Sequence, residues 1–289
     1  MSAIETIRPG IIKITPPQKP ESAWESPNLY LVGDKFPTLI DSGYDDPEQV
    51  DIVMEALSGR DLERIIITHC HIDHAGGAWL LREKTGATVL AHPDEAPALE
   101  RRFPGKKTDG WLEEYDKVDA DGMTLEMKLF PGHARGHLCP HIEKENIFFS
   151  GDLVTGKGSS LVAPPEGQMQ TYMRSLSALE ELAPDLILPG HGPIVEDPRT
   201  RVRELIEHRE LRELAIAKCL ARGPSKLMDL VRTMYMGLIH PHLEGPAAWT
   251  AWAHIEKMMA DGSVVKTPES ETNPFEMKFE IAPGVNLPF

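Results

Sequence analysis

The stretch RIIITHCHIDH, residues 64–74, combines a β-branched run with four candidate metal ligands in six positions. The run RIIIT is too short for a helix and is apolar on successive residues, which predicts a buried strand. Alternate side chains of an extended backbone share a face, so His69 and His71 can point at one metal ion. Asp73 and His74 follow as the chain turns and can reach a second point nearby. A histidine-rich solvent loop is the alternative, and the apolar strand before the cluster disfavours it.

Three further candidate ligands follow predicted strands and stand beside Gly or Pro: His133 in FPGH, Asp152 in FSGD and His191 in LPGHG. A single histidine in such a loop is more often structural than a ligand. Four strand ends of this kind together favour one site, because the crevice of an open α/β sheet lies beyond the carboxyl ends of its strands. The seven side chains supply nitrogen and oxygen without thiolate, a set compatible with zinc, iron, manganese or cobalt. Zinc is the metal we expect, and Cys70 should pack beneath the site.

Short apolar runs and amphipathic stretches alternate up to about residue 195, which predicts an α/β layered domain. The expected strands cover residues 28–33, 37–42, 64–68, 87–91, 124–130, 146–151 and 185–189, with a hairpin through EKEN between 124–130 and 146–151. The expected helices cover residues 47–58, 76–86 and 168–182, with a short helix inside 93–120. Later segments are helical at 199–222, 225–237 and 246–260, with a small strand or wing at 262–266. We predict a first domain at 1–197 and a helical C-terminal domain and tail at 198–289.

The motifs THCHIDH, PGH, SGD and PGHG, in this order and separation, resemble the metallo-β-lactamase superfamily over about residues 5–195. The resemblance implies a four-layer αβ/βα sandwich with two metal ions in the cleft between its halves. It also assigns the ligands: His69, His71 and His133 to one ion, Asp73, His74 and His191 to the other, and Asp152 as the bridge.

The C-terminal segment narrows the resemblance. SGDLVTGKGSS, LPGHGPIVEDP and the helical end are similar to the group named beta-lactamase-like protein two, which implies a winged-helix-like C-terminal domain. Two features depart from that group: residues 17–30 lack its Gly-Thr-Asn-Thr-Tyr segment, and Lys157 stands where close bacterial relatives often carry an aromatic residue. Both lie where a substrate would be touched, so the group's specificity does not carry over.

Candidate catalytic and substrate residues lie close to these motifs. Asp73 and His137 are the candidate catalytic residues; the resemblance suggests that His137 faces the bridging water, and a structural hydrogen bond is the alternative. The candidate substrate contacts, each with a merely structural or solvated role as its alternative, are Arg135, Lys157, Tyr172 and Trp24.

The expected function is hydrolysis. Two adjacent divalent ions lower the pKa of a bridging water and supply hydroxide, and one of them can polarise a carbonyl or phosphoryl oxygen. Small esters, lactones, thioesters, β-lactams and phosphoesters are the expected substrates. An endoribonuclease acting on single-stranded RNA is the first alternative, and an iron-dependent persulfide dioxygenase is a further one. A winged-helix binding module regulated by the metal domain is disfavoured, because residues 223–266 carry four basic and four acidic residues.

Composition restricts the partners. Acidic residues outnumber basic ones 45 to 30, for a formal charge of −15, which counts against nonspecific nucleic-acid binding without excluding RNA. No apolar run approaches the roughly 20 residues of a membrane span. The first residues do not resemble a signal peptide, and three cysteines suit a reducing compartment. We therefore expect a cytoplasmic protein with a small-molecule substrate and no membrane partner; the oligomeric state, including a homodimer, is left open.

Overall fold

Two β-sheets form the centre of the computed structural model, which describes residues 3–18, 25–235, 243–267 and 273–285. The first sheet has its seven strands in chain order: β1 (Ala3–Arg8), β2 (Ile11–Thr15), β3 (Leu29–Val32), β4 (Thr38–Ile40), β5 (Arg64–Ile66), β6 (Thr88–Ala91) and β7 (Gly110–Trp111). Its first four strands are antiparallel and β4 to β7 are parallel. The second sheet has the order β12 (Leu186–Pro189), β11 (Ile147–Gly151), β10 (Leu138–Ile142), β9 (Met123–Leu129) and β8 (Lys117–Ala120).

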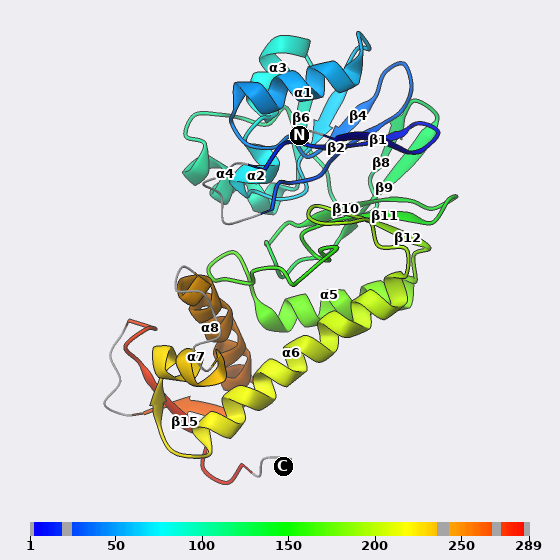
Figure 1. Ribbon diagram of the computed structural model, residues 1–289. Coiled ribbons are helices and arrows are strands. Elements are labelled where there is room, and N and C mark those ends of the chain that lie inside the picture. Colours follow the sequence, from blue (N-terminus) through cyan, green and yellow to red (C-terminus); the bar gives the residue numbers. More distant parts are fainter. Residues whose placement is uncertain (1–2, 19–24, 236–242, 268–272, 286–289) are drawn as a thin grey trace.

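Helices cover the outer faces of both sheets (Figure 1). The first sheet is covered by α1 (Pro47–Leu57), α3 (Ala78–Thr85) and the short elements α2 (Ile72–Ala75), η1 (Pro93–Glu95) and α4 (Ala96–Arg102). The second is covered by α5 (Met169–Leu182) and α6 (Pro198–Leu220). The layers therefore run helix, sheet, sheet, helix, as the expected four-layer sandwich requires.

Strand β3 shows how the sequence builds these layers. All four of its residues are buried, and successive side chains of a strand point to opposite faces. Leu29 and Leu31 enter the core beneath the helices of the first sheet. Tyr30 and Val32 enter the core between the two sheets. A continuous apolar run is therefore the pattern that a strand buried on both faces demands.

Only residues 78–85 of the helix predicted at 76–86 form one continuous helix. The chain forms α2 at Ile72–Ala75, turns at Gly76-Gly77, and forms α3 from Ala78. A Cβ atom on Gly77 would lie 2.3 Å from the Ser42 carbonyl oxygen, so the backbone approaches the segment after β4 too closely for any other residue. The helix ends at Gly86, as expected, in a left-handed conformation.

Five strands of the two sheets were missed: β1, β2, β7, β8 and β10. The hairpin through EKEN joins β10 to β11, and β9 precedes β10, so the prediction that it joins 124–130 to 146–151 is wrong. The sequence of β10 contains Pro140 and His141, which weaken a strand signal, although all five of its residues are buried. The hairpin of β1 and β2 was also missed, because the residues of β1 are almost all exposed and polar positions interrupt the apolar ones.

The C-terminal segment contains helices and a small sheet. Helices α7 (Leu227–Tyr235) and α8 (Glu244–Ala260) pack with the end of α6, and three short strands follow the order β13 (Ser225–Lys226), β15 (Lys278–Ile281) and β14 (Val264–Lys266). The small strand at 262–266 was expected, whereas β13 and β15 were missed. The winged-helix-like character of this segment and the boundary at residue 197 stay predictions.

Helix α6 connects this segment to the second sheet (Figure 1). Its Val202 and Leu205 enter the core beneath that sheet, and Ile216 enters the C-terminal core. Its Arg201 donates to the carbonyl oxygens of Thr155 and Gly158, and Arg209 donates to that of Ser160 at 2.6 Å. Within the described ranges, none of the helices has the length and apolar character that a membrane span requires.

Candidate metal centre

The seven predicted ligands converge at one end of the two sheets. His69, His71 and the short helix α2 follow β5, and His133 follows β9. Asp152 directly follows β11, and His191 comes two residues after β12. Strands from both sheets therefore end at the same place, and the loops after them bring the side chains together. Two groups result, His69, His71, His133 and Asp152 in one and Asp73, His74 and His191 in the other.

The first group surrounds a single point. His69 Nε2 lies 2.9 Å from His71 Nδ1 and 3.2 Å from His133 Nε2. His133 Nε2 lies 3.0 Å from His71 Nδ1 and 3.5 Å from Asp152 Oδ2. Nitrogen atoms bound to a tetrahedral ion at about 2.0–2.1 Å are roughly 3.3 Å apart. The spacing of these four atoms therefore fits one small cation.

The second group has the same spacing. His74 Nε2 and His191 Nε2 are 3.2 Å apart, and Asp73 Oδ2 lies 3.3 Å from His191 Nε2. Asp152 Oδ1 lies 3.4 Å from His74 Nε2 and 3.6 Å from His191 Nε2. Asp152 thus directs Oδ2 to the first group and Oδ1 to the second, which is the arrangement of a bridging carboxylate.

Hydrogen bonds behind the cluster orient the imidazoles. Asp41 accepts from the Thr68 hydroxyl at 2.9 Å and contacts His74 Nδ1 at 2.7 Å. The Thr68 oxygen in turn lies 2.9 Å from His69 Nδ1. Protons on both Nδ1 atoms satisfy these contacts and leave the two Nε2 lone pairs for a cation. His133 Nδ1 likewise contacts the Leu161 carbonyl oxygen at 2.8 Å, which leaves its Nε2 free.

The donor set fits metal ions by a further test. Asp152 Oδ1 is buried and has no hydrogen-bond partner among the described residues. A buried carboxylate oxygen without a partner is costly, and a cation between Asp152 and the second group would remove that cost. The residues present are therefore suited to hold two divalent ions.

Electrostatics agree with this interpretation. Burial, together with the neighbouring imidazole of His133, lowers the pKa of His71 to about 3. Its ring is therefore neutral and can offer a nitrogen lone pair to a metal ion. Burial acts in the same direction on His74, but the carboxylates of Asp41, Asp152 and Asp73 outweigh it and raise the pKa of His74 to about 10. Three carboxylates around one imidazole thus make the second group strongly attractive to positive charge.

The cluster opens into a cleft of about 550 Å³. This volume lies within the range of small-molecule sites, roughly 300–1,000 Å³. Lys157 lines it, as expected for a substrate contact, and its side chain is exposed. The cleft also contains residues that were not predicted, among them Tyr44, Ile72, Arg102 and Thr155.

Three other predicted site residues lie elsewhere. His137 is fully buried behind the cluster, where its Nε2 accepts from the Asp152 backbone N–H at 3.1 Å, so the structural alternative describes it and the water-facing one does not. Tyr172 is buried too and donates to the Leu153 carbonyl oxygen, because it belongs to the apolar face of α5. Arg135 donates to the Pro165 carbonyl oxygen outside the cleft. Trp24 lies outside the described residues.

Sequence reasoning missed two carboxylates that support the site. Asp41 directly follows β4, and the ligands also come after strands. Its position at a strand end could therefore have identified it as a candidate site residue. Glu95 is buried and accepts from the backbone N–H groups of Cys70 and Gly136, which ties two ligand loops together. Cys70 is buried beside them, as expected, and burial raises the pKa of its thiol.

Replacing Asp41 with Asn is expected to lower kcat/KM about 10- to 100-fold. Asp41 Oδ1 accepts from the Thr68 backbone N–H and Oδ2 contacts both the Thr68 hydroxyl and His74, whereas an amide can accept at only one of these two atoms. Asn tolerates the left-handed backbone of this position, where φ is 58°. The measurement is kcat/KM together with the metal content of the purified variant. Asp51→Asn, at an exposed residue paired with Lys84, is the control. Equal activity and metal content in the two variants would exclude this role of Asp41.

Comparisons with known proteins agree with the geometry. Residues 23–191 match the family described as the metallo-beta-lactamase superfamily. A relative from Caenorhabditis elegans, the beta-lactamase-like protein 2 homolog, is 29% identical over 255 residues, which cover 85% of this chain and 82% of the relative. The atrochrysone carboxyl ACP thioesterase of Aspergillus novofumigatus is 28% identical over 223 residues, 76% of this chain and 66% of that protein. The crystal structure of a beta-lactamase domain protein from Burkholderia ambifaria superposes with a TM-score of 0.82 at 23% identity, over 96% of this chain and 93% of that one. This likeness confirms the fold.

Proposed function

Since this chain belongs to the metallo-beta-lactamase superfamily, among the beta-lactamase-like proteins, we propose that it is a hydrolase of small acyl substrates, thioesters first, that holds two divalent metal ions. The observation that carries the proposal is the position of Asp152, whose two carboxylate oxygens face two separate groups of ligand atoms. Zinc is the metal we propose, on the chemistry of five imidazoles and two carboxylates.

Two ions held by these groups would supply a water of lowered pKa and a Lewis acid for the scissile carbonyl. The chain's own residues position that chemistry. Thr68 and Asp41 fix the imidazoles from behind, and Asp152 aligns the two groups. Asp73 lines the cleft and is the proposed proton acceptor for the attacking water.

The cleft supports a small substrate. Ile72, Tyr44 and Leu161 provide apolar surface beside the cluster, and Lys157 provides a cation at its edge. This combination suits an acyl chain with a polar or anionic end. A thioester is the first choice because relatives are named as acyl carrier protein thioesterases, and its carbonyl is activated towards hydroxide. The net charge of −15 disfavours RNA, whose phosphates it repels.

A substrate panel on the zinc-loaded protein tests the proposal. We expect kcat/KM for an acyl thioester to exceed that for a cephalosporin, a phosphodiester and single-stranded RNA by at least about tenfold. The matched oxygen ester should react more slowly than the thioester. Faster cleavage of RNA would replace this proposal with an endoribonuclease. Iron as the bound metal, with oxygen consumption on a persulfide, would replace it with a dioxygenase.

A further inference from the structure

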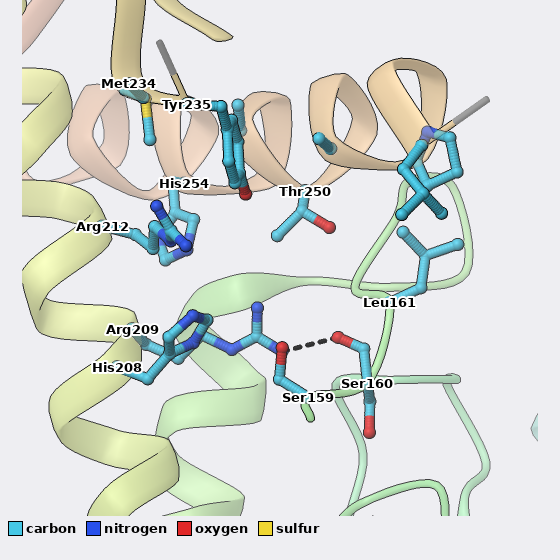
Figure 2. Close-up of a pocket in the computed structure, with 14 residues that line it drawn as sticks. Ser159, Ser160, Leu161, His208, Arg209, Arg212, Met234, Tyr235, Thr250 and His254 are labelled. Atoms are coloured by element: carbon cyan, nitrogen blue, oxygen red, sulfur yellow. Dashed lines mark hydrogen bonds between the residues drawn. The ribbon is translucent and has the colours of Figure 1, made fainter. Parts of the chain in front are cut away.

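A second pocket lies where the C-terminal helices meet the loop that carries Ser159, Ser160 and Leu161 (Figure 2). Residues of α6 form one wall and residues of α8 face them across the pocket. Its volume is about 160 Å³, below the roughly 300 Å³ at which sites for whole small molecules begin. The pocket therefore has room for one chemical group or a small ion.

The polar lining of this pocket is basic in a strongly acidic protein. Arg209 and Arg212 from α6 line it, with His208 on the same helix and His254 on α8. None of the described residues that line it is acidic. Glu213, which does not line the pocket, contacts His254 Nδ1 at 3.2 Å and also accepts from Lys257 at 2.9 Å.

The guanidinium groups of Arg209 and Arg212 are not paired with a carboxylate in the described part of the chain. Among the described residues neither Arg209 nor Arg212 forms an ion pair, although Arg209 is only 1% exposed. Arg209 donates to the Ser160 carbonyl oxygen and lies over the Tyr172 ring, while Arg212 lies over the Tyr235 ring. A buried charge without a counter-charge is costly, so an anion here would stabilise the protein.

Unused hydrogen-bonding atoms gather around the same space. Arg209 Nε, His208 Nδ1 and His254 Nε2 are buried without a hydrogen-bond partner in the described structure. Burial and the neighbouring guanidinium groups lower the pKa of His208 to about 4, so its neutral ring carries one N–H. Arg209 Nε and the N–H of His208 need an acceptor, which an oxyanion offers. His254 instead directs its Nδ1 proton to Glu213 and leaves Nε2 as an acceptor.

We propose that this pocket binds an oxyanion, a phosphate or carboxylate group, against the guanidinium groups of Arg209 and Arg212. The same loop separates it from the metal cleft, because Ser159, Ser160 and Leu161 line both cavities. On the cleft side, Ser160 Oγ donates to the Asp152 carbonyl oxygen and Leu161 accepts from His133. The oxyanion belongs either to the acidic end of the substrate, which rests on the proposed function, or to a free ligand whose binding orders this loop.

Binding of inorganic phosphate to the zinc-loaded protein, measured by isothermal titration calorimetry at constant ionic strength, tests the site. We expect Arg212→Gln to weaken phosphate binding at least about tenfold, because a charge-assisted hydrogen bond is lost. Arg203→Gln is the matched control: it removes the same charge from the same helix, at a residue that pairs with Glu180 outside the pocket. Thr250→Val, on the opposite wall, is the second variant and should weaken binding by a smaller factor.

The two sources of the oxyanion are separated by kinetics. Two thioesters that differ only in a terminal carboxylate or carboxamide are compared in the wild type and in Arg212→Gln. One result is that the wild type hydrolyses the carboxylate thioester in preference to the carboxamide, and that Arg212→Gln loses this preference through a higher KM at an unchanged kcat. That result assigns the pocket to the substrate. Phosphate binding that depends on Arg212 without such a preference assigns it to a free ligand.

Equal phosphate affinity in Arg212→Gln and Arg203→Gln would overturn the proposal, since phosphate held at the metal ions alone responds to neither change. A protein that binds phosphate through Arg212 but hydrolyses nothing in the panel would refute the proposed function and leave this site standing. Thermal unfolding of each variant shows that it is folded before binding is compared.

Discussion

The variant Asp152→Ala is expected to lower kcat/KM for the best acyl substrate about a thousandfold or more. Its Oδ2 faces the first ligand group and its Oδ1 faces the second, so the substitution weakens both metal sites together. Several kcal/mol of charge stabilisation at the transition state depend on such ions, and each 1.36 kcal/mol is a factor of ten in rate. The measurement is steady-state kinetics with metal analysis of the purified protein.

Asp152→Asn separates charge from shape in this experiment. The amide keeps the side-chain volume and one carbonyl oxygen. It is uncharged, however, and its NH₂ group cannot bind a cation, so it cannot bridge the two metal sites. We expect it to lose nearly as much activity as Asp152→Ala and to unfold at a temperature close to that of the wild type. Wild-type turnover in either variant, with metal lost, would show that hydrolysis does not depend on this cluster.

The variant Gly132→Ala is expected to lower the free energy of unfolding by about 4 kcal/mol and to abolish hydrolysis. Gly132 has φ of 127°, and a Cβ atom there would lie 2.3 Å from the backbone nitrogen and Cα of Tyr172. The positive φ costs about 1–3 kcal/mol and the forced displacement of packed backbone costs a similar amount. His133 is the next residue, so the displacement also moves a ligand. Chemical denaturation and kcat/KM measure the two effects.

Gly223→Ala is the matched control, because Gly223 has φ of 130° and a Cβ atom there would meet nothing within 4 Å. It carries the backbone cost without the collision, so about 2 kcal/mol of stability should be lost and activity should stay near wild type. If both variants lose the same stability and both keep activity, contact with Tyr172 does not explain why this position is glycine.

The sequence predicted most of the elements that border the site, and the errors have local causes. RIIIT was interpreted as a buried strand, and β5 is one. Strand β10 was missed because Pro140 and His141 interrupt its apolar pattern, and its burial comes from neighbouring strands that a single segment does not reveal. The turn at Gly76-Gly77 was missed because it depends on the closeness of Ser42, which is distant in sequence.

The candidate ligands could be predicted because they lie in the segments that follow β5, β9, β11 and β12, whereas the roles of the residues around them could not. Tyr172 belongs to a helix whose buried face was visible in the sequence, but which side of that face meets the cleft depends on packing. Arg135 and His137 share a loop with His133, yet one donates to Pro165 outside the cleft and the other is buried. The basic pocket joins α6 and α8 to a loop some fifty positions earlier, a juxtaposition that only the tertiary structure creates.

The arginines of α6 bear on whether the C-terminal part could be exchanged for another. Arg201 and Arg209 satisfy carbonyl groups of Thr155, Gly158 and Ser160, on the loop that Leu161 links to His133. A chain cut at residue 197 would leave those carbonyl groups without their donors. The loop that contacts His133 would then lose the hydrogen bonds that hold it against α6. Grafting a foreign tail onto the sandwich should therefore disturb the candidate metal centre even when the graft folds, because the long helix supports the loop that contacts His133 and so cannot be exchanged independently.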